Sequence, residues 1–229
     1  MKRLWNRTAL AALIALAPLS AAAAPATVGS PALAWQSMGT LSPAEGQKEN
    51  IGVAGLLQGT FGDYIIVGGG ANFPAGGPLT GGAKVTYPDV YVLRAAEAGL
   101  TETDHAQMPY PVGYGVSATT PDGVLYFGGS TDESGARAVT RLTAPNGKLR
   151  TETLPALPFA LQNGVAAYDK DTVYLGGGKQ DGVLSKKFYT YDIKTGTLTS
   201  LPDFPGEARE QSVAEFLGGR FFVFSGGAN

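Results

Sequence analysis

Cysteine is absent from this sequence, and histidine occurs once, as His105. Without cysteine the chain can form no disulfide and has no thiol nucleophile, so its stability must come from its core and its sheets. A single histidine is too few for a transition-metal centre, which takes several protein ligands. Because His105 lies in the polar stretch 103–107, we expect it to be solvated. We therefore expect no metal.

A basic excess and long apolar runs are lacking as well. Charged residues make up 16% of the chain, and its formal net charge is −2. Nucleic-acid binding needs a basic face, so we expect no nucleic-acid partner. A membrane-spanning helix needs about 20 apolar residues in a row, and no stretch after residue 24 has them. We expect no membrane contact for that part of the chain.

The first residues follow the three-part plan of a secretory signal peptide. Lys2, Arg3 and Arg7 are positive, the stretch 9–19 is apolar, and the small residues 20–24 follow. We predict that residues 1–24 are a signal peptide and that the mature chain, residues 25–229, is periplasmic or secreted. An uncleaved anchor helix is the alternative.

Glycine, by contrast, is abundant, with 33 of 229 residues, roughly twice the average usage. Short apolar runs bounded by Gly, Pro, Asn and Asp dominate after the signal peptide, and helical periodicity is missing there. This pattern favours an all-β fold. A chain of this length can bury one sizeable core.

A repeat underlies the glycine content. Four segments share an apolar strand, a polar turn, a second apolar strand and a pair of glycines. The second glycine of each pair stands at 69, 129, 177 and 227, at spacings of 60, 48 and 50. The inserted stretch 71–87, rich in Gly and Pro, accounts for the longer first spacing. Four unrelated glycine-rich turns are the alternative. A period near 50 with paired glycines is typical of kelch-type β-propellers.

Further strand candidates lie between the glycine pairs, which makes about four strands per unit, the content of one propeller blade. We predict blade units at about 51–105, 112–154, 162–201 and 210–229, and a lone outer strand at 33–38. On this interpretation the chain begins and ends inside a blade. The prediction is an all-β, kelch-type β-propeller with about four blades present of a probable six, an incomplete ring.

Four stretches resemble the kelch-repeat mutarotases, the relatives of N-acetylneuraminate epimerase, in cyclically permuted form. They are residues 52–55, 68–74, 110–117 and 204–211. The resemblance implies a periplasmic six-bladed propeller that interconverts anomers of sialic acid, with a small sugar-acid ligand and no cofactor. It also implies a catalytic glutamate in a Gly-Glu-x-x-x-Gly-x-Arg segment. This chain has no such segment, and by blade order we expect it beyond Asn229, so the catalytic residue is unknown.

Mutarotation opens and recloses a sugar ring, which takes one group that accepts a proton and one that donates it. Arg209 and Glu210, followed by Gln211, supply a cation and a carboxylate at the start of the fourth unit. Arginine also suits the carboxylate of a sugar acid. The resemblance places these three residues on a family stretch that faces the pocket. An exposed turn with ordinary surface charges is the alternative.

Three further residues are candidates for substrate binding. Asn72 and Phe73 open the inserted loop and could hydrogen-bond and stack on a sugar, or Phe73 could merely anchor the loop. Tyr114 enters the inner strand of the second unit and could present its hydroxyl to the channel, or pack between blades. The mutarotases resemble Arg-Ala-Tyr-Gly-Val-Ser here, whereas this chain has Val112-Gly-Tyr-Gly-Val-Ser. The missing arginine argues against sialic acid itself as the ligand.

Three hypotheses for the function follow. The chain is a sugar-acid mutarotase, and whether it is active as an enzyme stays open. It is a non-catalytic kelch module that binds a glycan or a protein partner of unknown kind. Or it is a structural remnant that folds poorly alone. The sugar and the oligomeric state are not predicted.

Overall fold

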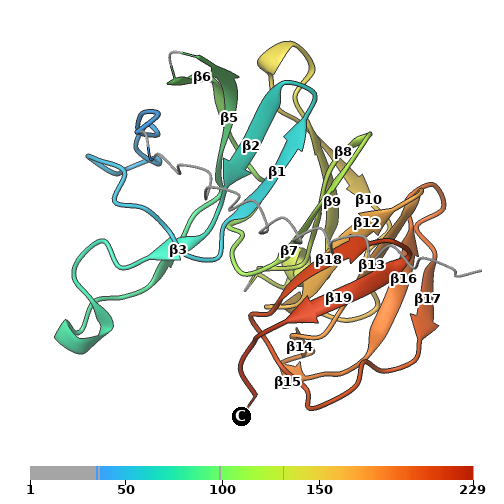
Figure 1. Cartoon of the computed structure of the whole chain (residues 1–229). Coiled ribbons are helices and arrows are strands. Elements are labelled where there is room, and N and C mark those ends of the chain that lie inside the picture. The colour runs from blue at the N-terminus through green and yellow to red at the C-terminus, as the bar shows by residue number, and fades with distance from the viewer. Residues whose placement is uncertain (1–34, 36, 98, 131, 229) are drawn as a thin grey trace, which may run out of the picture. The chain divides into compact units, whose positions relative to one another are not determined.

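The main sheets of the molecule are antiparallel (Figure 1). Within each of these sheets, the strands are paired in the order in which they occur in the sequence. The computed structural model describes residues 35, 37–97, 99–130 and 132–228. Within these described residues, four main sheets carry the fold: three have four strands each, and the fourth, β18-β19, has two. We call these sheets blades 1 to 4. The predicted all-β, kelch-type propeller fold is confirmed.

The blades are built from short strands. Blade 1 contains β1 (Leu57–Phe61), β2 (Tyr64–Gly68), β5 (Asp89–Ala96) and β6 (Gly99–Gln107). Blade 2 contains β7 (Val116–Thr120), β8 (Gly123–Phe127), β9 (Val139–Thr143) and β10 (Arg150–Leu154). Blade 3 contains β12 (Val165–Asp169), β13 (Thr172–Gly176), β16 (Phe188–Asp192) and β17 (Leu198–Leu201). Blade 4 contains β18 (Val213–Leu217) and β19 (Arg220–Phe224).

Short elements complete the described part of the chain. They are β3 (Ala71–Asn72), β4 (Val85–Thr86), β11 (Leu161–Gln162), β14 (Lys179–Gln180), β15 (Val183–Leu184), the one-turn helix α1 (Glu133–Ala136) and the 3-10 turns η1 (Pro78–Thr80) and η2 (Pro145–Gly147). None of the helices in these described ranges is long and apolar enough to cross a membrane.

The predicted unit boundaries can be set beside these strands. β6 ends at Gln107, beyond the predicted end at 105, and the other blade strands start and end within the predicted units. The predicted signal peptide, residues 1–24, lies outside the described residues, as do residues 33, 34 and 36 of the predicted strand 33–38. Trp35, Ser37 and Met38 are described, and none of them belongs to a strand.

A pair of residues with positive φ follows the second strand of each blade, and in blades 1 to 3 it bonds to the segment before the next blade. The pairs are Gly69-Gly70, Gly128-Gly129, Gly177-Gly178 and, in blade 4, Ser225-Gly226. In blade 2, Gly128 N donates to Ala138 O at 2.8 Å within the blade, and Gly129 N donates to Leu161 O at 2.9 Å, just before blade 3. A Cβ on Gly128 would lie 2.3 Å from Leu161 O. The close approach and the left-handed conformation both require glycine.

These pairs correct the repeat register. The second residues of the equivalent pairs are 70, 129, 178 and 226, rather than the predicted 69, 129, 177 and 227. The bonding pattern supports this register, because Gly70 N and Gly178 N donate to Val112 O and Arg209 O, as Gly129 N does to Leu161 O. Runs of three glycines, or of serine and two glycines, hide this shift in the sequence.

Apolar side chains fill the spaces between the blades. Leu57, Ile66, Val90 and Val92 of blade 1 lie in one buried cluster with Val124, Tyr126 and Leu142 of blade 2. A second cluster joins blades 2 and 3 and includes Leu125, Phe127, Val173, Leu175 and Tyr191. Between blades 3 and 4 the rings of Tyr174 and Phe216 stack with centroids 4.9 Å apart. The alternation of the strands thus gives each blade two apolar faces.

The first strands of the blades, β1, β7, β12 and β18, lie beside one another in that order (Figure 1). Gln58 N and Thr60 N of β1 donate to Ser117 Oγ and Thr119 Oγ1 of β7, both at 3.2 Å. A central cavity of about 590 Å³ is lined by residues of all four strands or just before them. Many of its lining residues are small: Gly59, Gly115, Ser117, Gly164, Ala166, Ser212 and Ala214.

An irregular segment, residues 38–53, covers the outer face of blade 1, and we call it the strap. Its ends and middle are tied to the blade. Leu100 N donates to Met38 O at 3.0 Å. Ser42 donates from its backbone N and its Oγ to the Glu102 carboxylate, at 3.1 and 2.7 Å. Glu45 N donates to Asp89 Oδ1 at 3.1 Å.

Candidate functional site

A row of left-handed residues marks one end of the central cavity. Gly55, Tyr114, Asn163 and Gln211 have φ values of 68°, 62°, 54° and 58°, and each stands two residues before the first strand of its blade. Their backbones form a chain, since Tyr114 N donates to Gly55 O, Asn163 N to Tyr114 O and Gln211 N to Asn163 O, at 2.7, 2.7 and 2.9 Å. Positive φ is uncommon outside glycine and often marks a functional position.

The side chains of this row lie around one hollow, which we call the mouth pocket. Its volume is about 500 Å³, and its lining is Lys84, Thr86, Gly113, Tyr114, Gly129, Gln162, Asn163 and Gln211. Lys84 comes from the inserted stretch 71–87, and its Nζ lies 4.0 Å from the centroid of the Tyr114 ring, a cation–π contact. A Cβ on Gly55 would come within 2.5 Å of that ring, so glycine leaves room for it.

A charged pair lies beside the mouth pocket. Asn163 Nδ2 donates to Glu210 Oε2 at 2.7 Å, and Lys179 Nζ lies 3.2 Å from Glu210 Oε1. The Glu210 side chain is 18% exposed. Its backbone forms a two-way bridge with Gly227, with both N···O distances at 2.9 Å. The carboxylate therefore holds the Asn163 amide in place at the pocket wall and has an ammonium group for a partner.

Arg209 lies elsewhere. It lines a separate cavity of about 370 Å³ with Phe188, Pro202, Asp203, Phe204, Pro205, Phe221 and Val223. Its Nε donates to Glu207 O at 3.2 Å, and its Nη1 donates to Ser225 O at 3.4 Å. Neighbouring residues of an extended chain point in opposite directions, and Arg209 and Glu210 do so. The structure thus brings Tyr114, Glu210 and Gln211 together around Asn163 and leaves Arg209 apart; its binding role stays a prediction.

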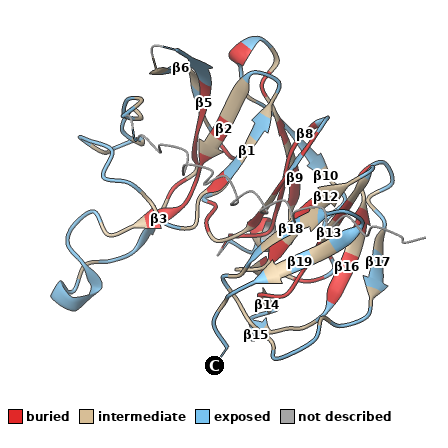
Figure 2. Ribbon diagram, viewed as in Figure 1, coloured by how far each residue is buried: buried red, intermediate tan, exposed pale blue. Residues whose placement is uncertain are grey.

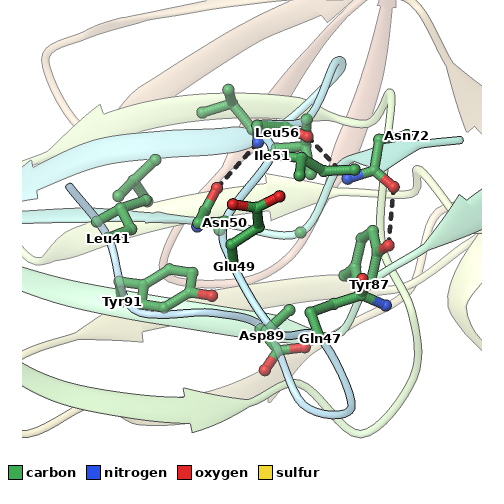
Figure 3. A pocket seen from close by; sticks show the side chains of 16 residues that line it. Leu41, Gln47, Glu49, Asn50, Ile51, Leu56, Asn72, Tyr87, Asp89 and Tyr91 are labelled. Carbon is green, nitrogen blue, oxygen red and sulfur yellow. Dashed lines mark hydrogen bonds between the residues drawn. The ribbon is translucent and has the colours of Figure 1, made fainter. Parts of the chain in front are cut away.

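Asn72 and Phe73 are also outside the mouth pocket. Asn72 Nδ2 donates to Gly52 O at 2.8 Å, and Tyr87 Oη donates to Asn72 Oδ1 at 2.7 Å. Asn72 lines a cavity of about 250 Å³ between blade 1 and the strap, which we call the strap pocket (Figure 3). Phe73 is half-buried and lines neither pocket. A binding role for either residue remains a prediction.

His105 is bonded rather than merely solvated, which corrects the sequence-based expectation. Its Nε2 lies 2.8 Å from Asp89 Oδ1, and its side chain is 28% exposed. Its ring stacks on Tyr91 with centroids 4.4 Å apart. Burial, together with the negative charges of Asp89 and Glu102, raises the pKa of Tyr91 to about 12. The described ranges hold no group of three or more side chains suited to a metal ion.

No family model matches the chain. N-acetylneuraminate epimerase of Yersinia pestis (strain Pestoides F) is 35% identical over 130 residues, which are 52% of this chain and 32% of that protein. Two proteins of the same name, from Pasteurella multocida (strain Pm70) and Haemophilus influenzae (strain 86-028NP), are 28% and 32% identical over 55% and 48% of the chain.

The chain resembles the N-acetylneuraminate epimerases. The alignments span about a third of the length of these relatives, with 32%, 35% and 30% of each covered. The resemblance to this group, drawn from the sequence, is therefore confirmed.

Sequence reasoning missed four residues that the site uses: Lys84, Gln162, Asn163 and Lys179. Asn163 could have been found, because it stands two residues before a strand, as Tyr114 and Gln211 do. Lys84 and Lys179 carry no such signal. A lysine in a glycine-rich insertion and a lysine after a glycine run have nothing to distinguish them until the fold brings them to the mouth pocket.

Proposed function

We propose that this chain binds a sugar acid related to N-acetylneuraminate in the mouth pocket and catalyses its mutarotation. We further propose that residues 1–24 export it to the periplasm. The observation that supports the function is the mouth pocket itself: a polar hollow with a lysine over an aromatic ring and three amides, next to a paired carboxylate and ammonium. The sequence resemblance to N-acetylneuraminate epimerases points to the same class of ligand.

The pocket offers the groups that a sugar acid needs. The exposed ammonium of Lys84 can pair with the carboxylate of the ligand. The amides of Gln162, Asn163 and Gln211 can donate to and accept from its hydroxyl groups. Because Glu210 takes a hydrogen bond from Asn163 Nδ2, Asn163 keeps its Oδ1 as an acceptor with a set orientation.

Mutarotation needs one proton acceptor and one proton donor. In this proposal Glu210 takes the proton of the anomeric hydroxyl, and Lys179 gives a proton to the ring oxygen as the bond from that oxygen to the anomeric carbon breaks. The open-chain keto form then rotates about the bond next to the carbonyl. The two proton transfers reverse as the ring closes on the other face, so no atom is gained or lost.

Binding without turnover is the second candidate function. Both oxygens of the Glu210 carboxylate already have partners, Lys179 and Asn163. Glu210 itself lies beside the mouth pocket, whose lining, within the described residues, contains no carboxylate. This arrangement favours a kelch module that recognises a glycan and leaves its anomers unchanged.

The test uses two measurements on the chain. Binding of N-acetylneuraminate is followed by saturation-transfer NMR, and exchange between its anomers by two-dimensional exchange NMR. We expect Lys84→Gln to weaken binding by about tenfold, since a hydrogen bond to a charged group contributes about 1.5–3 kcal/mol. Lys187→Gln, which removes an exposed lysine of blade 3, is the matched control and should bind normally.

Glu210→Gln separates the two candidates. Mutarotation predicts an exchange rate in the wild type above that of buffer, which falls to the buffer rate in this variant while binding persists. Binding with no acceleration in the wild type would establish the second candidate. Loss of binding in none of the variants, or no binding by the wild type, would overturn the assignment of the mouth pocket.

A further inference from the structure

The strap pocket is a second hollow, and it shares no lining residue with the mouth pocket. It lies between the outer face of blade 1 and the strap, and its volume is about 250 Å³. Much of its wall is apolar, from Leu41, Ile51, Val53, Leu56 and Val67. Figure 3 shows Leu41, Ile51 and Leu56 around the hollow. Small-molecule sites are typically apolar hollows with a few polar groups, and drug-sized ligands occupy about 300–1,000 Å³. This pocket suits a smaller molecule.

The charged groups of the strap pocket are of one sign. Its lining includes the carboxylates of Glu49 and Asp89 and the hydroxyls of Tyr87 and Tyr91, and it includes no lysine or arginine. Glu49 is exposed, and no ion pair joins its carboxylate to a described residue. The mouth pocket, with Lys84, has the opposite character. An apolar hollow with negative groups favours a cation.

Tyr91 supplies a second, independent feature of this pocket. The residue is 4% exposed, and its hydroxyl makes no hydrogen bond to any residue in the described part of the chain. Figure 3 shows this hydroxyl directed into the pocket, toward the side of Glu49. Tyr87, on the same wall, does have a partner in Asn72. A ligand in the pocket can therefore reach a hydroxyl that no described side chain has taken.

The walls around this hydroxyl are held in place. Asp89 Oδ1 accepts from Glu45 N and lies 2.8 Å from His105 Nε2, so strap and blade share one carboxylate. Asn50 Oδ1 accepts from Gly52 N at 3.0 Å, which fixes the turn after Glu49. The pocket is therefore preformed, and a ligand would lose little free energy in ordering it.

We infer that the strap pocket binds a small organic cation, a primary ammonium carried on a compact apolar body. The ammonium donates to the Glu49 carboxylate and to the Tyr91 hydroxyl oxygen, and the body packs on Leu56, Val67 and Ile51. Hydrogen bonds between ionised groups are about twice as strong as neutral ones. This site uses none of the residues of the mouth pocket. The inference is therefore independent of the proposed mutarotation.

The experiment compares two probes of the same shape. Cyclohexylamine is a cation at neutral pH, and cyclohexanol has the same ring without the charge. Binding of each to the chain is measured by saturation-transfer NMR and calorimetry. We expect the amine to bind about tenfold more tightly than the alcohol. Equal affinities, or binding of neither probe, would overturn the inference.

Variants locate the site. Glu49→Gln, at an exposed position that leaves folding intact, should abolish the preference for the amine. Tyr91→Phe keeps the ring on His105 and should weaken amine binding by a few-fold, through loss of one hydrogen bond. Glu133→Gln, an exposed carboxylate on α1, is the matched control and should bind like the wild type. A preference for the amine that survives in Glu49→Gln would place the cation elsewhere and refute the site.

Discussion

The two end faces of the row of blades differ in what lies on them. The outer face of blade 1 carries Tyr91 and Leu93, which are 4% and 6% exposed, because the strap covers it. The outer face of blade 4 carries Val213, Leu217, Phe222 and Phe224, which are all exposed. Figure 2 shows the contrast between the buried β8 of blade 2 and the partly exposed β19.

Both faces come from the same kind of sequence. Strand alternation places apolar side chains on each side of every blade, and equivalent positions are occupied by Ile66, Leu125, Tyr174 and Phe222. The first two are fully buried, whereas Phe222 is 37% exposed. Burial is therefore a property of the neighbour and not of the strand. An exposed apolar face of this kind typically marks a surface that another surface covers.

The largest difference in stability should come from alanine substitutions at equivalent positions of two blades. Ile66→Ala removes a fully buried side chain between blades 1 and 2 and should lower the free energy of unfolding by about 2–5 kcal/mol. Phe222→Ala should cost less than about 1 kcal/mol, since its side chain keeps much of its exposure in the folded state. Urea denaturation followed by circular dichroism measures both. Equal losses would show that the face of blade 4 is covered in solution.

The ties of the strap offer the next test. Glu102→Gln replaces the carboxylate that accepts two hydrogen bonds from Ser42, and it should cost about 2 kcal/mol. Hydrogen exchange should rise in residues 38–53 and stay unchanged in blade 4. Glu152→Gln is the control. It removes a carboxylate on β10, the outermost strand of blade 2, where Glu152 pairs with Arg141 of the same blade and not with the strap. Unchanged exchange in the strap would contradict its attachment through Ser42.

Alkaline pH should loosen the covered face through Tyr91. Burial, followed by the charges of Asp89 and Glu102, raises its pKa to about 12, from 10.0 in the unfolded chain. The neutral hydroxyl is therefore the stabilised form. Its contribution is complete below pH 10 and is lost as the pH rises from 10 to 12.

The measurement is the unfolding free energy as a function of pH in the wild type and in Tyr91→Phe. The difference between them isolates Tyr91 from Tyr126, whose pKa burial also raises. The wild type should lose more stability above pH 10 than the variant. Blade 4 has no tyrosine in its strands and should contribute no such loss. Parallel curves for the wild type and Tyr91→Phe would mean that the strap does not bury Tyr91.

The smallest effect on stability belongs to Phe224, which is 54% exposed. Phe224→Ser should change the unfolding free energy by less than about 0.5 kcal/mol, as surface substitutions generally do. It should nevertheless lower the binding of a hydrophobic fluorescent dye, because one ring of the Phe222–Phe224 stack is lost. Unchanged dye fluorescence would show that the exposed face of blade 4 is not the hydrophobic surface of the molecule.

Much of the fold could be predicted because its signals are local. Alternation with a period of two residues, turns at Gly and Pro, and glycines with positive φ depend on a few neighbouring residues. The glycine register was wrong by one residue in three of the pairs for a local reason as well, since adjacent glycines in Gly68–Gly70 and Gly176–Gly178 cannot be ranked without their hydrogen bonds.

The candidate site was only partly predictable. Tyr114, Glu210 and Gln211 could be named because they stand at the start of a strand in a recognisable stretch. Arg209 was grouped with Glu210 by adjacency, yet their side chains lie in different pockets. Lys84 contacts Tyr114 from the inserted stretch, and Lys179 pairs with Glu210 from β14. Such contacts depend on long-range packing that no local pattern encodes.

The sequence alone therefore determined the all-β class, the repeated unit and the resemblance to the epimerases, because each depends on patterns of residues that are close together in the sequence. Only the tertiary structure decided that His105 bonds Asp89, that Asn163 joins the mouth pocket, and that the strap buries one end face while the other stays exposed. These features depend on which distant surfaces meet, and apolar strands of the same composition are buried or exposed according to the neighbour that the fold provides.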